Sequence, residues 1–124
     1  MFESKFFRWL KKMQILFWIA LVTVVAFELR IDGVQSSPPS PYWEEVALGY
    51  DAYSILKTGK DHHGNPWPLV AFPSFGDYKP SLYFYALLPS IQAYGLNVFA
   101  VRLPSVLASS LTVGLTSWLA LSLI

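Results

Sequence analysis

Long apolar runs are the feature that most constrains how this chain can fold. The first run covers residues 13–29, and two more follow in the C-terminal half of the sequence. A helix needs about 20 mostly apolar residues to cross the hydrocarbon core of a bilayer. The sequence therefore predicts three transmembrane helices, over 8–29, 81–94 and 97–124.

The composition agrees with a membrane protein. Hydrophobic residues make up 54% of the chain and charged residues 14%, whereas a soluble domain carries about a quarter charged residues. The sequence has no cysteine, which excludes disulfides and cysteine-ligated metals. It also has no lysine or arginine block to cover a phosphate backbone, so we expect no nucleic-acid partner.

The basic N-terminus predicts the orientation of the first helix. Four cations accompany the single acid Glu3, and these are Lys5, Arg8, Lys11 and Lys12. The positive-inside rule then places the N-terminus in the cytoplasm and residues 30–80 outside. A cleaved signal peptide is the alternative, but Arg30 and Asp32 follow the apolar run where a small-residue cleavage site would lie. We therefore favour an uncleaved signal anchor.

The outer loop, residues 30–80, is predicted to contain an amphipathic juxtamembrane helix over 41–58. Ser40 and Pro41 are typical of a helix start, and Gly59 is typical of a helix end. An apolar stripe is expected on one face, formed by Val46, Gly49, Tyr50, Tyr53, Ile55 and Leu56. Residues 60–78 show no sustained period and are predicted to form a loop.

The predicted fold class is therefore all-α, a polytopic transmembrane helix bundle with juxtamembrane amphipathic helices in the first outer loop. The sequence ends inside an apolar run, without the basic or polar flank in which a spanning helix usually ends. We expect residues 1–124 to be the N-terminal fragment of one transmembrane domain. A complete small membrane protein is the alternative.

Glu44 and Glu45 are the main candidates for chemistry. Adjacent side chains on a helix point roughly 100° apart, so these two carboxylates are expected to do different jobs. One can face a cavity while the other pairs or caps. Desolvation near a membrane would raise the pKa of a carboxylate toward the range of a general base. A pair that only complements the helix dipole is the alternative.

Lys79 and Arg102 are the candidate cations. Lys79 lies just before a predicted helix, where a cation opposes the helix dipole, and a lipid phosphate would explain its position. Interfacial anchoring explains Lys79 almost as well. Arg102 lies one turn inside the last apolar run, where it can hold a phosphate or pair with an acid such as Asp51.

His62 and His63 invite a metal interpretation. Adjacent histidine side chains diverge and rarely chelate one ion, and no further residues complete a spacing typical of metal ligands. A polar loop is therefore favoured over a metal site.

Three motifs in a fixed order resemble a known family. They are GYDAYSILKTGKDHHG after the acidic pair, then FGDYKPSLYFY, then FAVRLPS. Over roughly residues 28–115 the chain resembles the N-terminal part of bacterial membrane glycosyltransferases of the protein O-mannosyltransferase and aminoarabinose-transferase type, which have the type C glycosyltransferase fold.

The resemblance implies an integral protein of the bacterial inner membrane that acts as a hexosyl or pentosyl transferase. The expected partners are membrane lipids, a sugar donor carried on polyprenyl phosphate, and a protein, lipid or glycan acceptor on the outer side. No cofactor or metal is implied. The fragment alone is expected to be inactive, and a non-catalytic membrane protein of the same fold that binds a lipid or a partner is the alternative.

The resemblance also assigns roles to site residues. Glu44 stands where the family usually has Asp, and it matches the base that activates the acceptor hydroxyl. Glu45 matches the second acid of the pair. Lys79 matches a lysine that contacts the lipid phosphate. Arg102 matches a motif whose expected role is structural rather than catalytic.

Overall fold

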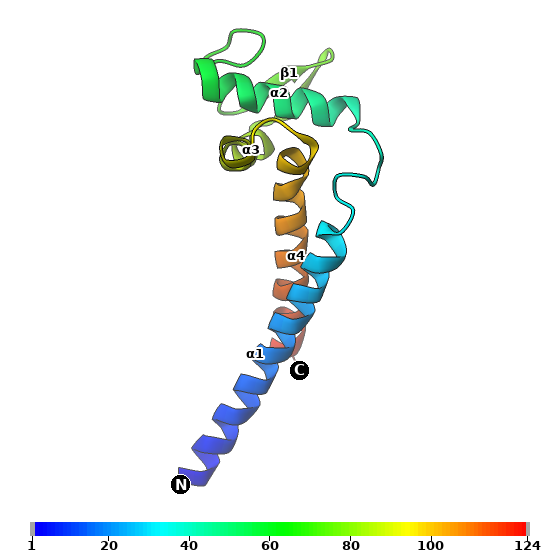
Figure 1. Cartoon of the computed structure of the whole chain (residues 1–124). Coiled ribbons are helices and arrows are strands. Elements are labelled where there is room, and N and C mark those ends of the chain that lie inside the picture. Colours follow the sequence, from blue (N-terminus) through cyan, green and yellow to red (C-terminus); the bar gives the residue numbers. More distant parts are fainter. Residues whose placement is uncertain (1, 124) are drawn as a thin grey trace. The chain divides into compact units, whose positions relative to one another are not determined.

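A computed structural model describes residues 2–123, and most of them are helical. The elements in chain order are α1 (Phe2–Ile31), α2 (Trp43–Thr58), β1 (Ala71–Ser74), β2 (Asp77–Pro80), α3 (Ser81–Tyr94) and α4 (Val98–Ser122) (Figure 1). The chain divides into two compact units. One contains α1 and α4 from Val106 onward, and the other contains residues 33–105.

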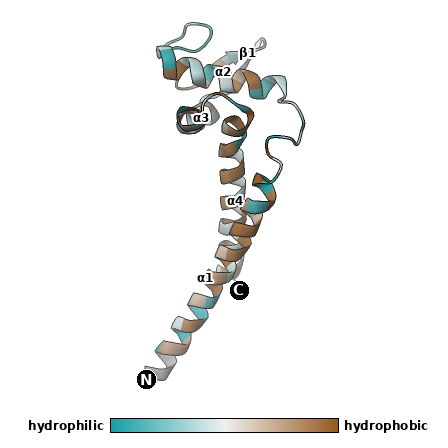
Figure 2. Ribbon diagram, viewed as in Figure 1, coloured by the Kyte–Doolittle hydropathy of each residue, from teal (hydrophilic) through white to brown (hydrophobic). Residues whose placement is uncertain are grey.

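Two helices of the described chain are long and apolar enough to cross a membrane, Lys5–Ile31 and Val98–Ser122. Their 27 and 25 residues rise about 40 and 37 Å, whereas the hydrocarbon core is about 30 Å thick. Figure 2 shows that the hydrophilic residues of α1 gather toward its two ends. The length and apolar composition of the two helices favour membrane association.

The second expected transmembrane helix is too short to span by itself. α3 covers Ser81–Tyr94, the predicted residues, and is 14 residues long. Fourteen residues rise only about 21 Å, less than the thickness of the hydrocarbon core. Gly95 ends the helix, and its N–H donates to the carbonyl of Ile91 at 2.8 Å. The prediction of a helix over 81–94 is therefore right. The prediction that this helix crosses the membrane is not supported, because the helix is shorter than the hydrocarbon core is thick.

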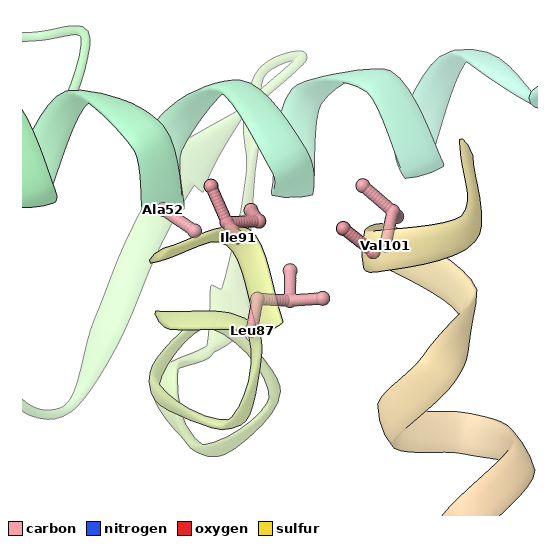
Figure 3. Packing of buried hydrophobic residues seen from close by; sticks show 5 residues of the cluster. Ala52, Leu87, Ile91 and Val101 are labelled. Atoms are coloured by element: carbon pink, nitrogen blue, oxygen red, sulfur yellow. The ribbon is translucent and has the colours of Figure 1, made fainter. Parts of the chain in front are cut away.

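Inside the second unit, α2 runs crosswise over α3 (Figure 1). Five buried residues form the contact between α2, α3 and the first turn of α4, namely Ala52, Leu87, Ile91, Ala100 and Val101. Figure 3 shows Leu87, Ile91 and Val101 beneath α2. Close-packed apolar side chains of this kind are the main stabilising contribution to such a unit.

A β-hairpin formed by β1 and β2 packs against α2 and α3 through a second buried cluster. Phe72 of β1 stacks on Phe84 of α3 with ring centroids 3.8 Å apart, and Ile55 of α2 completes this second cluster. The strands pair from Ala71 opposite Pro80 to Ser74 opposite Asp77. The prediction that residues 60–78 form only a loop is therefore wrong over the hairpin.

The hairpin escaped prediction because of its turn. Phe75 and Gly76 connect the strands with φ of 51° and 79°, as a two-residue turn that matches the strand twist requires. Glycine favours this conformation, but a bulky aromatic residue with positive φ is uncommon. Of the two turn residues, only Gly76 is therefore typical of a tight hairpin, and Phe75 is not.

The predicted end of α2 is confirmed, and its predicted start is not. Gly59 is left-handed with φ of 72°, and its N–H donates to the carbonyl of Ile55. The helix begins at Trp43 rather than after Ser40 and Pro41. The N–H of Tyr42 donates to Glu45 Oε2 at 2.9 Å, so the cap comes from inside the helix.

The apolar stripe of α2 also differs from the prediction. Val46 and Tyr50 are 54% and 52% exposed, whereas Gly49, Ala52 and Ile55 are buried. The buried face is therefore rotated toward the small residues, which let α4 approach the helix backbone closely.

We expect Gly49→Ala to lower the melting temperature of the detergent-solubilised protein. An added Cβ would lie 2.7 Å from Cγ2 of Val101 and 3.1 Å from Cδ1 of Leu96, which is too close for unstrained packing. In an uncrowded helix the same change stabilises by about 1 kcal/mol. Circular dichroism melts check the sign, and the loss should be reduced when Val101→Ala makes room. A higher melting temperature in the single variant would contradict this packing.

Candidate functional site

The two carboxylates of the acidic pair have separate partners. Both lie in the first turn of α2. Glu44 Oε1 accepts a hydrogen bond from Nζ of Lys79 at 2.8 Å, and Glu45 pairs with Arg102. This arrangement agrees with the expectation that neighbouring side chains on a helix do different jobs.

Glu45 is held in place by a fork of hydrogen bonds. Arg102 donates through Nε to Oε1 at 3.0 Å and through Nη2 to Oε2 at 2.9 Å. The N–H of Tyr42 donates to the same carboxylate. Bidentate charge-assisted bonds of this kind fix geometry as well as adding stability. The carboxylate of Glu45 therefore serves as a structural anchor for the start of α2.

Arg102 uses its remaining donors on the linker that precedes α2. Nη1 donates to the carbonyls of Val34 at 2.8 Å and Pro38 at 3.1 Å, and Nη2 donates to the carbonyl of Ser40 at 3.4 Å. With the two bonds to Glu45, each of its N–H groups has an acceptor. Only 7% of Arg102 is exposed. These contacts favour a structural role over phosphate binding, and the suggested pairing with Asp51 is wrong.

The pKa of Glu45 moves in the direction opposite to the one expected for a desolvated carboxylate. The hydrogen bond from Arg102 holds the pKa of Glu45 below its usual value of 4.5, and it outweighs the effect of desolvation. The N–H of Tyr42 lowers the pKa further. The expectation of a raised pKa is therefore wrong for Glu45, which stays ionised and is poorly suited to act as a base.

The Glu44–Lys79 pair is more accessible. The side chain of Glu44 is 42% exposed and that of Lys79 is 29% exposed. Lys79 lies on β2 opposite Phe72, so its backbone is fixed by the hairpin. The hydrogen bond to Glu44 raises the pKa of Lys79, and Asp77 adds to this effect. The structure thus brings together the expected base and the expected phosphate-binding lysine.

The histidine pair belongs to a loop anchor. His62 donates its backbone N–H to Oδ1 of Asp51 at 2.9 Å, and its Nδ1 lies 2.5 Å from the same oxygen. Asp51 is wholly buried. Among the described side chains of residues 5–123, no group of three or more histidine, cysteine or acidic residues is arranged to hold a metal ion.

Asp51 has a contact that the sequence does not predict. The sequence suggests Asp51 only as a partner for Arg102, whereas in the structure it is buried and hydrogen-bonded to His62. A buried acid on a helix indicates a specific internal contact. Asp61 supports the same loop, since it accepts the N–H groups of His63 and Asn65. Burial opposes ionisation of Asp61, but the hydrogen bond from Nδ2 of Asn65, together with the two backbone N–H groups, prevails and lowers its pKa.

Hollows flank the first turns of α2. A cavity of about 230 Å³ lies between α2 and the start of α4, and Glu45 and Arg102 form its polar edge. Its other walls are mainly apolar and are formed by Pro41, Val46, Tyr50, Leu96, Asn97, Val98 and Val101. Another hollow lies beside Trp43, which stacks on Phe75 of the hairpin turn at 4.5 Å.

Comparison of the chain with protein-family models, with curated proteins and with solved structures found no match.

We expect Arg102→Lys to destabilise the protein by about 2 kcal/mol or more, because an ammonium cannot reproduce the fork and leaves buried acceptors unsatisfied. Thermal unfolding in detergent measures the loss. Lys79→Met, which removes a cation from the accessible pair, is the control and should have a much smaller effect. Equal losses in the two variants would contradict the structural role of Arg102.

The stability that Glu45 contributes should depend on pH. Its pKa is lowered in the folded state, so this contribution is fully present above the unfolded value of about 4.5 and is lost as pH falls through the folded value. Melting temperatures of wild type and Glu45→Gln, measured between pH 7 and pH 3, should differ by a constant amount at high pH and converge below about 4.5. A gap that widens on acidification would contradict the pairing with Arg102.

Proposed function

We propose that this chain is the N-terminal part of a membrane glycosyltransferase that uses a polyprenyl-phosphate sugar donor. The full protein would be a polytopic helix bundle in the bacterial inner membrane, with its N-terminus in the cytoplasm and residues 30–80 outside. α1 and α4 supply helices of spanning length. The basic side chains near the N-terminus, beginning with Lys5 and Arg8, support this orientation.

The observation that carries the proposal is that Glu44 and Glu45 have different partners and different exposure. Glu45 is committed to Arg102 and to the cap of α2. Glu44 is at the surface of the same turn, next to the cation Lys79. A carboxylate at the surface can reach the hydroxyl of an acceptor, and the ammonium group beside it can meet the phosphate of an anionic donor.

The proposed reaction is a displacement at the anomeric carbon of the donor sugar. The hydroxyl oxygen of the acceptor forms a new bond to that carbon, and the bond from the carbon to the phosphate oxygen breaks. The polyprenyl phosphate leaves with the electron pair of the broken bond, and the hydroxyl proton passes to Glu44. Lys79 offsets the charge that grows on the phosphate. The configuration at the anomeric carbon is inverted.

A second function is supported by the ion pair itself. Glu44 is engaged by Lys79 at 2.8 Å in this structure, and this hydrogen bond occupies a carboxylate oxygen that a base would present to the acceptor hydroxyl. A non-catalytic membrane protein of the same fold, which binds a lipid or a partner at this surface, is compatible with that arrangement.

Glu44→Gln in the full-length protein tests the proposal. We expect loss of sugar transfer from radiolabelled undecaprenyl-phosphate mannose or aminoarabinose, with normal expression and an unchanged melting temperature. Glu44→Asp is the matched control, because it keeps the carboxylate and should retain part of the activity. Wild-type turnover in Glu44→Gln would exclude Glu44 as the base. Binding of the lipid without any sugar release by the wild type would favour the second function.

A further inference from the structure

The two ion pairs at the start of α2 differ in how readily they can exchange partners. Arg102 is buried and joins Glu45 by two bonds, and three backbone carbonyls occupy its other donors. Lys79 joins Glu44 by one bond, and both side chains are partly exposed. Exposed single-bond pairs are weak, whereas buried forked pairs are strong. The Glu44–Lys79 pair is therefore the exchangeable one.

Lys79 needs an anion beside it. It is followed by Pro80, the residue that precedes the first turn of α3. A cation close to a helix N-terminus opposes the helix dipole, and no acidic residue lies in the first turn of α3 to compensate. In this structure Glu44 supplies the compensating charge. A phosphate group can supply the same charge, with more oxygens to accept hydrogen bonds.

We propose that Lys79 is an exchangeable cation, which holds Glu44 while the site is empty and transfers to the phosphate when the lipid carrier binds. This inference rests on the proposed function, and it adds that donor binding controls when Glu44 becomes available. When Lys79 leaves, Oε1 of Glu44 loses its hydrogen-bond donor and is open to the hydroxyl of the acceptor. Donor binding would then precede productive acceptor binding, because the acceptor hydroxyl finds a free carboxylate only after the exchange.

The surrounding structure allows this exchange without refolding. The backbone of Lys79 is fixed opposite the buried Phe72, while its four-carbon side chain can rotate about several bonds. Glu45 stays bound to Arg102, so the first turn of α2 keeps its position when Glu44 loses its partner. The movement is limited to one lysine side chain.

Binding of undecaprenyl phosphate to the full-length protein in detergent tests the exchange. Because Glu44 competes with phosphate for Lys79, Glu44→Gln should tighten binding several-fold. The same change in a Lys79→Met background should give no gain. Asp77→Asn is the matched control, since it removes a negative charge near Lys79 but not its hydrogen-bonded partner. It should tighten binding less than Glu44→Gln does.

Inorganic phosphate provides the second arm of the experiment. A gain with both probes supports exchange with a phosphate group from either source, and a gain with undecaprenyl phosphate alone supports exchange with the lipid phosphate. Unchanged or weaker binding in Glu44→Gln, or a gain that persists without Lys79, would overturn the exchange. A Lys79-dependent gain in binding without any sugar transfer by the wild type would support the exchange and reject the proposed transferase. Sugar transfer that depends on Glu44, without that gain in binding, would support the transferase and reject the exchange.

Discussion

The organisation of the unit formed by residues 33–105 depends on the buried contact between Arg102 and Glu45. One guanidinium joins the start of α4, the first turn of α2 and the linker through Val34, Pro38 and Ser40. A buried arginine is tolerated only when its charge is paired and its donors are satisfied, and both conditions hold here. Removing Glu45 would leave the buried charge of Arg102 without its partner, and removing Arg102 would leave the linker carbonyls without their donor.

This anchor also determines what the acidic pair can do. Glu45 is held in its ionised form by Arg102, so it contributes to the fold rather than to proton transfer. The adjacent Glu44 is directed to a different side of the helix and meets Lys79. A rigid anchor beside an accessible, exchangeable ion pair is an arrangement in which chemistry can occur without disturbing the fold.

The sequence predicted the end of α2 better than its start, and it did not predict the partners of the two glutamates. Gly59 marked the end of α2 because a left-handed residue there favours glycine. The start was misplaced because Glu45 caps Tyr42 from within the helix, whereas Ser40 offered the commoner signal. The hairpin was missed because its turn contains Phe75. The ion pairs join residues 35 and 57 positions apart, and local patterns carry no information about such partners.

A double-mutant cycle between Arg102 and Glu45 measures the central contact most directly. Stabilities of wild type, Arg102→Met, Glu45→Gln and the double variant give the interaction between the two side chains. If the forked pair anchors the unit, each single change is costly, and the double variant loses clearly less than the sum of the two losses, by about 2 kcal/mol. Additive losses would show that the two residues act independently and would contradict this account.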